Sequence, residues 1–268
     1  HETFKIATGS SLTAENVLVK VKGEGKTGWG NACPNSVTQE TTESIIRALK
    51  IMKERVEGEE VDIEDNWKMW RNELPDDRAA LAGLDIALWD LKGKLEGKRV
   101  FELFDGKEEG VLTDRTIGIM PKGDTVKHAK EYLDQGFRAL KIKIGLDLLE
   151  DIQRIDAVRE SVGPDIKIWI DANQGYSVQE AITICKKIEP MDISFVEQPV
   201  REDDLEGMKE VTEKSSVPIM ADESMKDHET AEEICGEEMA DMVNIKLMKC
   251  GGITGGRKIV DVIEKYEI

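Results

Sequence analysis

Residues 166–175 read Ile-Lys-Ile-Trp-Ile-Asp-Ala-Asn-Gln-Gly, a short apolar run that ends in polar residues. Runs of this length that are rich in Ile and Val indicate strands buried on both faces of a sheet. Similar runs recur along the chain at the spacing of one βα unit. The predicted strands are 115–119, 139–144, 166–172, 194–200, 217–221 and 242–248.

Helical patterns alternate with these strands, at 125–135, 149–162, 177–188 and 227–235, and a last one follows at 254–266. Regular βα alternation predicts an α/β fold, and we favour a TIM-type (β/α) barrel. A doubly wound sheet is the alternative, but the G-x-G-x-x-G turn that such folds place after their first strand is absent.

The chain divides into two predicted parts, 1–112 and 113–268. The first is a small α+β unit with a hairpin before Trp29 and amphipathic helices at 41–55 and 78–95. The second is the barrel. Six strands cannot close an eight-stranded barrel, so we expect a chain truncated after its sixth βα unit, with an incomplete N-terminus and the C-terminal strands missing.

Charge and cysteine content exclude several classes of function. The 37 Lys and Arg residues against 55 Asp and Glu give a net charge of −18, which disfavours nucleic acid and membrane partners. No segment reads as a signal peptide or a membrane span. The cysteines lie far apart, so reduced thiols in a cytoplasmic protein are the expectation, and the histidines are isolated. These residues are Cys33, Cys185, Cys235, Cys250, His1, His128 and His228.

Three carboxylates follow consecutive predicted strands. Asp171, Glu197 and Asp222 are 26 and 25 residues apart, one βα unit each. The C-terminal ends of barrel strands meet at one rim, so these side chains should converge. Helix capping is the alternative for any one of them. Clustered anions need a cation, and an all-oxygen set predicts Mg²⁺ as cofactor, with these three residues as its ligands.

Lysines accompany the carboxylates on two other strands. Lys141 and Lys143 are two residues apart, so they share one face of their strand, and Lys246 takes the corresponding place on the sixth strand. Strands two and six oppose each other in an eight-stranded barrel, so Lys143 and Lys246 should face one another. Two bases beside a metal-stabilised enediolate would permit racemisation or epimerisation at the carbon next to a carboxylate, if the pKa of the base falls toward neutrality.

Five ordered motifs carry a resemblance to a known family. They are 141–143 Lys-Ile-Lys, 171–176 Asp-Ala-Asn-Gln-Gly-Tyr, 196–199 Val-Glu-Gln-Pro, 221–224 Ala-Asp-Glu-Ser and 244–253 Asn-Ile-Lys-Leu-Met-Lys-Cys-Gly-Gly-Ile. The chain resembles the enolase superfamily in its muconate-lactonizing subgroup, most closely the dipeptide epimerases of the Ala-Glu type.

The resemblance implies a modified (β/α)7β barrel with an N-terminal capping domain, and a homo-oligomer. It makes Lys143 and Lys246 the acid/base pair and Asp171, Glu197 and Asp222 the Mg²⁺ ligands. Lys141 would touch the substrate carboxylate, and Thr116 would line the pocket.

The substrate class stays open among several alternatives. Gly9 lies near the place where Ala-Glu epimerases have a substrate-binding arginine, which argues against an acidic second residue in a dipeptide. A dipeptide epimerase is our first expectation. An o-succinylbenzoate synthase or a muconate cycloisomerase-like enzyme is the second. An inactive barrel that only binds ligands, or a sugar-phosphate TIM barrel, represents a different class, against which the retained polar groups argue.

Overall fold

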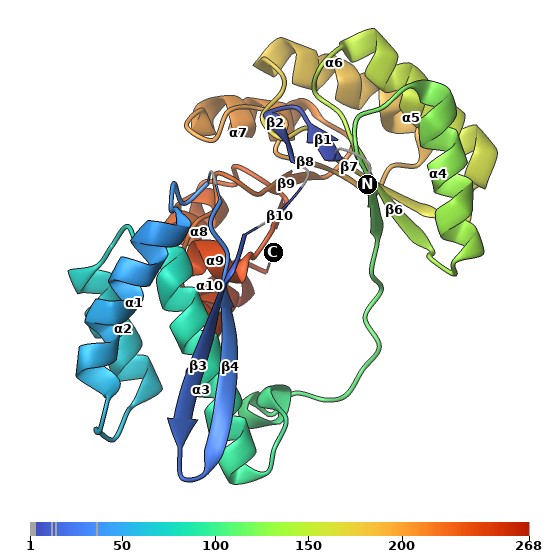
Figure 1. The fold of residues 1–268 in the computed structure, drawn as a ribbon. Coiled ribbons are helices and arrows are strands. Elements are labelled where there is room, and N and C mark those ends of the chain that lie inside the picture. The colour runs from blue at the N-terminus through green and yellow to red at the C-terminus, as the bar shows by residue number, and fades with distance from the viewer. Residues whose placement is uncertain (1–3, 12, 14, 36, 268) are drawn as a thin grey trace.

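The computed structural model describes residues 4–11, 13, 15–35 and 37–267, and it shows two groups of elements (Figure 1). We call the first group the cap. It contains the hairpin β3 (Val17–Gly23) and β4 (Lys26–Ala32) and three helices, α1 (Thr42–Val56), α2 (Ile63–Glu73) and α3 (Arg78–Glu96). The antiparallel pair β1 (Phe4–Ile6) and β2 (Gly9–Ser11) comes before it in the chain but lies beside the sheet (Figure 1), where the Ile119 amide donates to the Lys5 carbonyl oxygen at 2.9 Å.

The hairpin packs directly on the backbone of α3. A Cβ atom at Gly30 would lie 1.9 Å from the carbonyl oxygen of Gly83, and one at Gly28 would lie 2.0 Å from that of Ala87. Only glycine permits such an approach, which explains why β4 is glycine-rich although glycine disfavours strands. The predicted hairpin and both predicted cap helices are confirmed.

The second group is a parallel sheet of six strands in the order β10-β9-β8-β7-β6-β5, with helices between successive strands. Together with the cap it forms the predicted TIM-type α/β architecture. The strands are β5 (Arg115–Ile117), β6 (Ala139–Lys143), β7 (Lys167–Asp171), β8 (Phe195–Glu197), β9 (Ile219–Ala221) and β10 (Met242–Val243). The helices are α4 (Lys122–Asp134), α5 (Leu148–Val162), α6 (Val178–Ile188), α7 (Leu205–Lys214), α8 (His228–Gly236), α9 (Leu247–Cys250) and α10 (Ile253–Tyr266).

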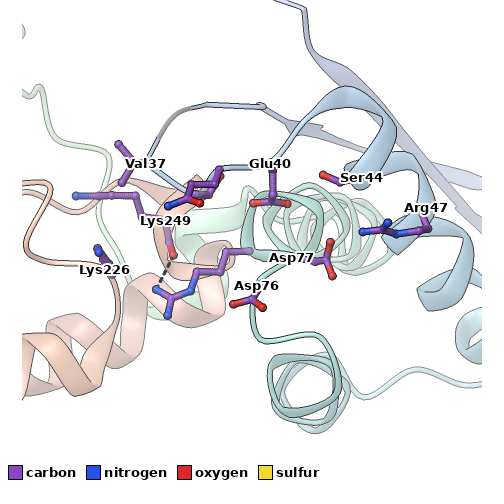
Figure 2. A pocket seen from close by; sticks show the side chains of 11 residues that line it. Val37, Glu40, Ser44, Arg47, Asp76, Asp77, Lys226 and Lys249 are labelled. Atoms are coloured by element: carbon purple, nitrogen blue, oxygen red, sulfur yellow. Dashed lines mark hydrogen bonds between the residues drawn. The ribbon is translucent and has the colours of Figure 1, made fainter. Parts of the chain in front are cut away.

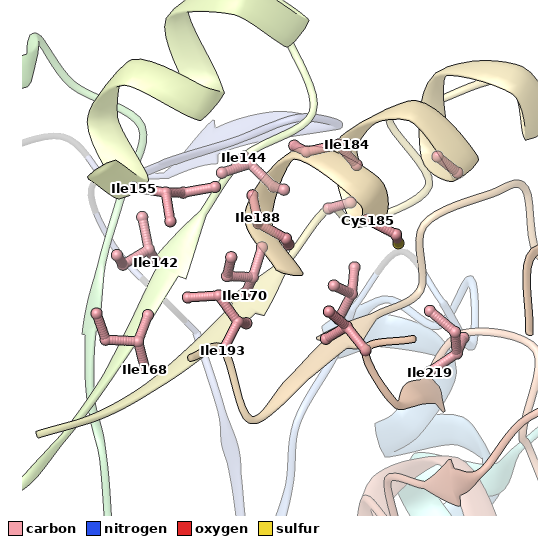
Figure 3. Close-up of a cluster of buried hydrophobic side chains, with 14 of the residues drawn as sticks. Ile142, Ile144, Ile155, Ile168, Ile170, Ile184, Cys185, Ile188, Ile193 and Ile219 are labelled. Atoms are coloured by element: carbon pink, nitrogen blue, oxygen red, sulfur yellow. The ribbon is translucent and has the colours of Figure 1, made fainter. Parts of the chain in front are cut away.

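An isoleucine-rich core joins the sheet to its helices. Ile142 and Ile170 on neighbouring strands lie below Ile155 of α5 and Ile188 of α6, and all four are fully buried (Figure 3). β-branched side chains suit this position because they pack well on a pleated surface. The core holds the strands in register, so that residues at their C-terminal ends lie at one rim.

Helix α3 connects the cap to the end of the barrel. The Trp89 indole donates to Thr254 Oγ1 at 2.9 Å, and the Thr254 hydroxyl donates to Asp85 Oδ1 at 2.6 Å. Arg71 and Arg78 both pair with Asp227, the residue that caps α8. Burial raises the pKa of the Asp85 carboxyl to about 6.

The structure corrects the bounds of several predicted strands and adds elements that the sequence analysis missed. β5, β8 and β9 are each two to four residues shorter than predicted. We expected a strand over 242–248, but β10 ends at Val243 and residues 247–250 form the short helix α9. The helices α2 and α7 were not predicted. Each has few apolar residues, since contact with the cap core or the sheet requires only a narrow apolar stripe. The domain boundary at 112/113 stays a prediction.

Candidate active site

Buried carboxylates gather at the C-terminal rim of the sheet. Asp171 ends β7, Glu197 ends β8 in register with it, and Asp222 directly follows β9. Their exposed fractions are 0%, 1% and 0%. Such burial is costly for charged groups without partners, so the surroundings must compensate.

Lysine side chains supply that compensation. Lys141 Nζ donates to Glu197 Oε2 at 2.5 Å and lies 2.8 Å from Asp171 Oδ2. Lys143, in register with Asp171, donates to Asp171 Oδ2 at 2.6 Å. Lys246 donates to Asp222 Oδ2. Asn244 and Lys249 join these two groups, because Asn244 Nδ2 donates to Glu197 Oε1 at 2.9 Å and Lys249 donates to both the Asn244 carbonyl oxygen and Asp222. The structure therefore brings the three predicted carboxylates and the three predicted lysines into one connected network.

The two predicted bases contact different members of this network. Lys143 lies on the Asp171 side of Glu197, and Lys246 lies on the Asp222 side. Lys246 is not on a strand as expected. It occupies the extended residue that precedes α9, because the chain leaves the sheet after Val243. Its side chain is 37% exposed, against 11% for Lys143, so it is the more accessible of the two.

The pKa values of the carboxylates Glu197 and Asp222 are shifted in opposite directions. Burial and repulsion from Asp171 raise the pKa of Glu197 to about 7, although Lys141 acts against this. Burial also opposes ionisation of Asp222, but Lys249 and Lys246 lower its pKa to about 2. Burial alone would lower the pKa of Lys246, whereas Asp222 raises it. The net result is a pKa of Lys246 above its ordinary value.

The donor set has the chemistry that a hard divalent cation needs. It consists of carboxylate oxygens on adjacent strands, and Glu197 carries unfavourable repulsion that a cation would remove. Among the residues that the structure describes, no group of three acidic, histidine or cysteine side chains is arranged to hold a metal ion. Each carboxylate turns toward a lysine instead. The three predicted ligands stay predictions.

Thr116 lies on β5 in register with Lys141. Residues in register on neighbouring strands project to the same face, so Thr116 and Lys141 share a side of the sheet. The Thr116 hydroxyl donates to Asp114 Oδ2 at 3.2 Å. Its predicted contact with substrate remains untested.

The sequence analysis did not identify Lys249, which contacts the Asp222 carboxylate at the oxygen that Lys246 does not contact. Lys249 Nζ donates to Asp222 Oδ1 at 2.6 Å and also to the Asp222 carbonyl oxygen, and its side chain is 1% exposed. Gln198 accepts at Oε1 from the Asp222 amide at 2.9 Å. Lys246 and Lys249 are three residues apart, a spacing that brings two side chains together in a helical turn but not in a strand. Because a strand was predicted there, the spacing did not point to Lys249.

A cavity of about 580 Å³ lies where the cap meets this end of the barrel (Figure 2). Arg78 crosses it and donates to the Lys249 carbonyl oxygen at 3.4 Å. Acidic and basic side chains both line the cavity, among them Glu40 and Lys226. Lys249 belongs both to this lining and to the carboxylate network.

Comparisons with known proteins place these features in a family. Residues 124–268 match the family described as Enolase C-terminal domain-like, and residues 1–105 match the N-terminal domain of mandelate racemase / muconate lactonizing enzyme. The L-Ala-D/L-Glu epimerase of Bacillus subtilis is 37% identical over 96% of this chain and 72% of its own length. The Hydrophobic dipeptide epimerase of Enterococcus faecalis is 36% identical over 98% of this chain and 75% of its own length.

Comparison with solved structures leads to the same family. The crystal structure of a dipeptide epimerase from Enterococcus faecalis V583, complexed with Mg and the dipeptide L-Leu-L-Tyr, matches with a TM-score of 0.96 at 36% identity. The match covers 100% of this chain and 76% of that one. The expected isomerase class and Mg²⁺ cofactor are therefore those of the relatives. This chain belongs to the enolase superfamily, in its mandelate racemase / muconate lactonizing branch.

Proposed function

We propose that this protein is a Mg²⁺-dependent epimerase that removes and returns the proton next to a carboxylate, with a dipeptide as substrate. One observation carries the proposal: Lys143 and Lys246 reach the same carboxylate network from its two ends. A base on each side of a planar intermediate lets a proton leave one face and return on the other. The relatives support the dipeptide, because one of them is named Hydrophobic dipeptide epimerase.

Asp171, Glu197 and Asp222 would hold the ion in this proposal. When Mg²⁺ is bound, its charge stabilises the negative charge that develops on the substrate carboxylate as the α-proton leaves. Lys141 lies between Asp171 and Glu197, where its ammonium group would meet the substrate carboxylate. Lys143 would take the proton from one epimer, and Lys246 from the other.

A dipeptide without an acidic second residue is the substrate that we propose. Gly9 leaves open space where the Ala-Glu epimerases are expected to have an arginine, and no atom lies within 4 Å of a Cβ built there. A positively charged partner for an acidic side chain is thus not supplied by this residue. Hydrophobic dipeptides are the first to test, because one relative is named for them.

Deuterium incorporation tests the proposal. The protein with Mg²⁺ should be incubated in D₂O with a panel of dipeptides and with an o-succinylbenzoate synthase substrate. Mass spectrometry should show one deuterium at the α-carbon, together with the appearance of the other epimer. Loss of water from the second substrate without any epimerised dipeptide would favour the alternative enzyme class.

The proposal includes a cytosolic site of action and a homo-oligomer. The described cysteines are all free and three are buried, which is typical of proteins in reducing compartments. No described helix is long and apolar enough to cross a membrane. Sedimentation velocity tests the assembly, and a monomer at all concentrations would contradict it.

A further inference from the structure

Asn173 forms a bridge between a proposed base and a carboxylate that has no assigned role. Lys143 Nζ donates to Asn173 Oδ1 at 2.7 Å, and Asn173 Nδ2 donates to Glu223 Oε1 at 3.0 Å. Asn173 and Glu223 are 4% and 5% exposed. The bridge spans three strands, because Lys143 ends β6, Asn173 follows β7 and Glu223 follows β9.

The two partners fix the orientation of the Asn173 amide. A lysine ammonium group can only donate and an ionised carboxylate can only accept, so the amide oxygen must face Lys143 and the amide nitrogen must face Glu223. The backbone is held as well. Asn173 has a φ of 41° in the left-handed region, and its N–H donates to Asp171 Oδ1 at 2.9 Å. Such conformations persist where the surroundings determine them, and they concentrate at functional sites.

Glu223 is poorly satisfied for a buried carboxyl group. In the part of the chain that the structure describes, Oε2 has no hydrogen-bond partner, and Oε1 accepts only from Asn173. A buried polar atom without a partner is unfavourable. Packing or helix capping does not account for Glu223, since its one hydrogen bond leads to Lys143 through Asn173.

We propose that Glu223 is a positioning residue for Lys143, acting through the Asn173 amide. This inference rests on the proposed epimerase function. Lys143 would be aimed at one face of the substrate by Asp171 and Asn173 together. Lys246 makes no hydrogen bond to this bridge in the part of the chain that the structure describes. It is held by Asp222, and the charge of Glu223 acts on it less than the charges of Asp222 and Glu197 do. Disturbing Glu223 should therefore impair proton transfer on the Lys143 face and spare the Lys246 face.

Two substitutions separate a hydrogen-bonding role from a structural one. Glu223→Leu removes the acceptor at similar size, whereas Glu223→Gln can still present an oxygen to Asn173. Glu223→Leu removes a poorly paired carboxylate but leaves the buried Asn173 amide donor without an acceptor, so its melting temperature should fall by no more than a few degrees, whereas Glu223→Gln should keep the wild-type value. Glu202→Gln is the matched control, because Glu202 pairs with Lys226 at 2.7 Å and does not contact the bridge.

The measurement is exchange of the α-proton into D₂O, recorded separately for each epimer with Mg²⁺ present. The epimer that reacts at Lys143 is identified as the one that Lys143→Ala cannot exchange. Glu223→Leu should slow exchange of this epimer about ten-fold, the value expected for one buried hydrogen bond, and change the other less than two-fold. Glu223→Gln should recover most of the loss, and Glu202→Gln should leave both rates unchanged.

Equal loss on both faces, or no loss in Glu223→Leu, would overturn the proposal. Exchange of neither epimer by the wild-type protein would instead refute the proposed function. In that case a crystal structure of Glu223→Leu decides the positioning role alone. It should show the Lys143–Asn173 contact broken, and an unchanged contact would contradict the inference.

Discussion

At the scale of single residues, the site depends on balancing three buried carboxylates with lysines. Glu197 shows how close this balance is, because burial and Asp171 raise its pKa to about 7 even though Lys141 lies within hydrogen-bonding distance. Asp222 is at the other extreme, with two lysines and a pKa of about 2. A cation bound among these carboxylates would relieve the repulsion at Glu197.

Removing a proposed ligand should abolish both metal binding and turnover. We expect Asp171→Asn, Glu197→Gln and Asp222→Asn each to lower kcat at least about 100-fold, as loss of a charge-stabilising group does. Chelation of the wild-type protein should have the same effect, and Mg²⁺ should restore activity. Mg²⁺ should also raise the melting temperature of the wild-type protein and not that of Asp222→Asn. Full turnover after exhaustive chelation would disprove the metal requirement.

Residues of this site differ in how far the sequence reveals them. Asp171, Glu197 and Asp222 could be predicted because they repeat at βα spacing after apolar strands. Lys249 and Glu223 could not, because their roles depend on contacts between segments 27 and 50 residues apart in the chain. A lone lysine in a turn or a second acid after a strand has no pattern of its own.

At the scale of elements, the short α9 explains why the strand predicted at 242–248 ends at Val243. The run after Met242 is apolar enough for a strand, and Lys246 and Lys249 are three apart, which also fits one helical turn. Tertiary contacts decide between them. Lys249 reaches Asp222 only from a helical turn, and Gly251 ends that turn in the left-handed conformation with φ 79°.

The contact between β4 and α3 should tolerate no side chain at Gly30. Gly30→Ala would place a methyl group 1.9 Å from the Gly83 carbonyl oxygen, so the hairpin must shift. We expect the free energy of unfolding to fall by roughly 1–3 kcal/mol, as in other overpacked cores, in urea titrations followed by circular dichroism. Gly123→Ala in α4 is the control, because its Cβ would meet no atom within 4 Å. An unaffected Gly30→Ala would mean that the hairpin is not packed as described.

The junction between α3 and α10 should depend on pH through Asp85. Burial raises its pKa from 3.8 to about 6, so the folded protein holds a proton there that the unfolded chain has lost. The stabilisation is fully present below pH 3.8 and is lost as the pH rises through about 6. Asp85→Asn keeps an acceptor for Thr254 and does not titrate.

The stability of Asp85→Asn relative to wild type should therefore increase by about 3 kcal/mol between pH 4 and pH 7. Urea titrations at several pH values measure this difference directly. A constant difference over the whole range would show that folding does not raise the pKa of Asp85.

At the scale of the whole molecule, the barrel architecture could be predicted from the sequence, whereas the contacts between the barrel and the cap could not. Strand positions follow from apolar runs, and the six-stranded parallel order confirms them. The contacts of Trp89, Asp85 and Arg78 with the barrel end join residues more than 140 apart in the chain, which no local pattern encodes. These contacts place the cap beside Lys249, and Lys249 in turn contacts Asp222.

The central claim is that two lysines act on opposite faces of one substrate. Lys143→Ala and Lys246→Ala should each abolish epimerisation in both directions, because each direction needs a base on one face and an acid on the other. In D₂O with Mg²⁺, each variant should still exchange the α-proton of one epimer, and the two variants should retain opposite epimers. Epimerisation that survives in Lys246→Ala would contradict the two-base account and leave Lys246 as a group that only stabilises the intermediate.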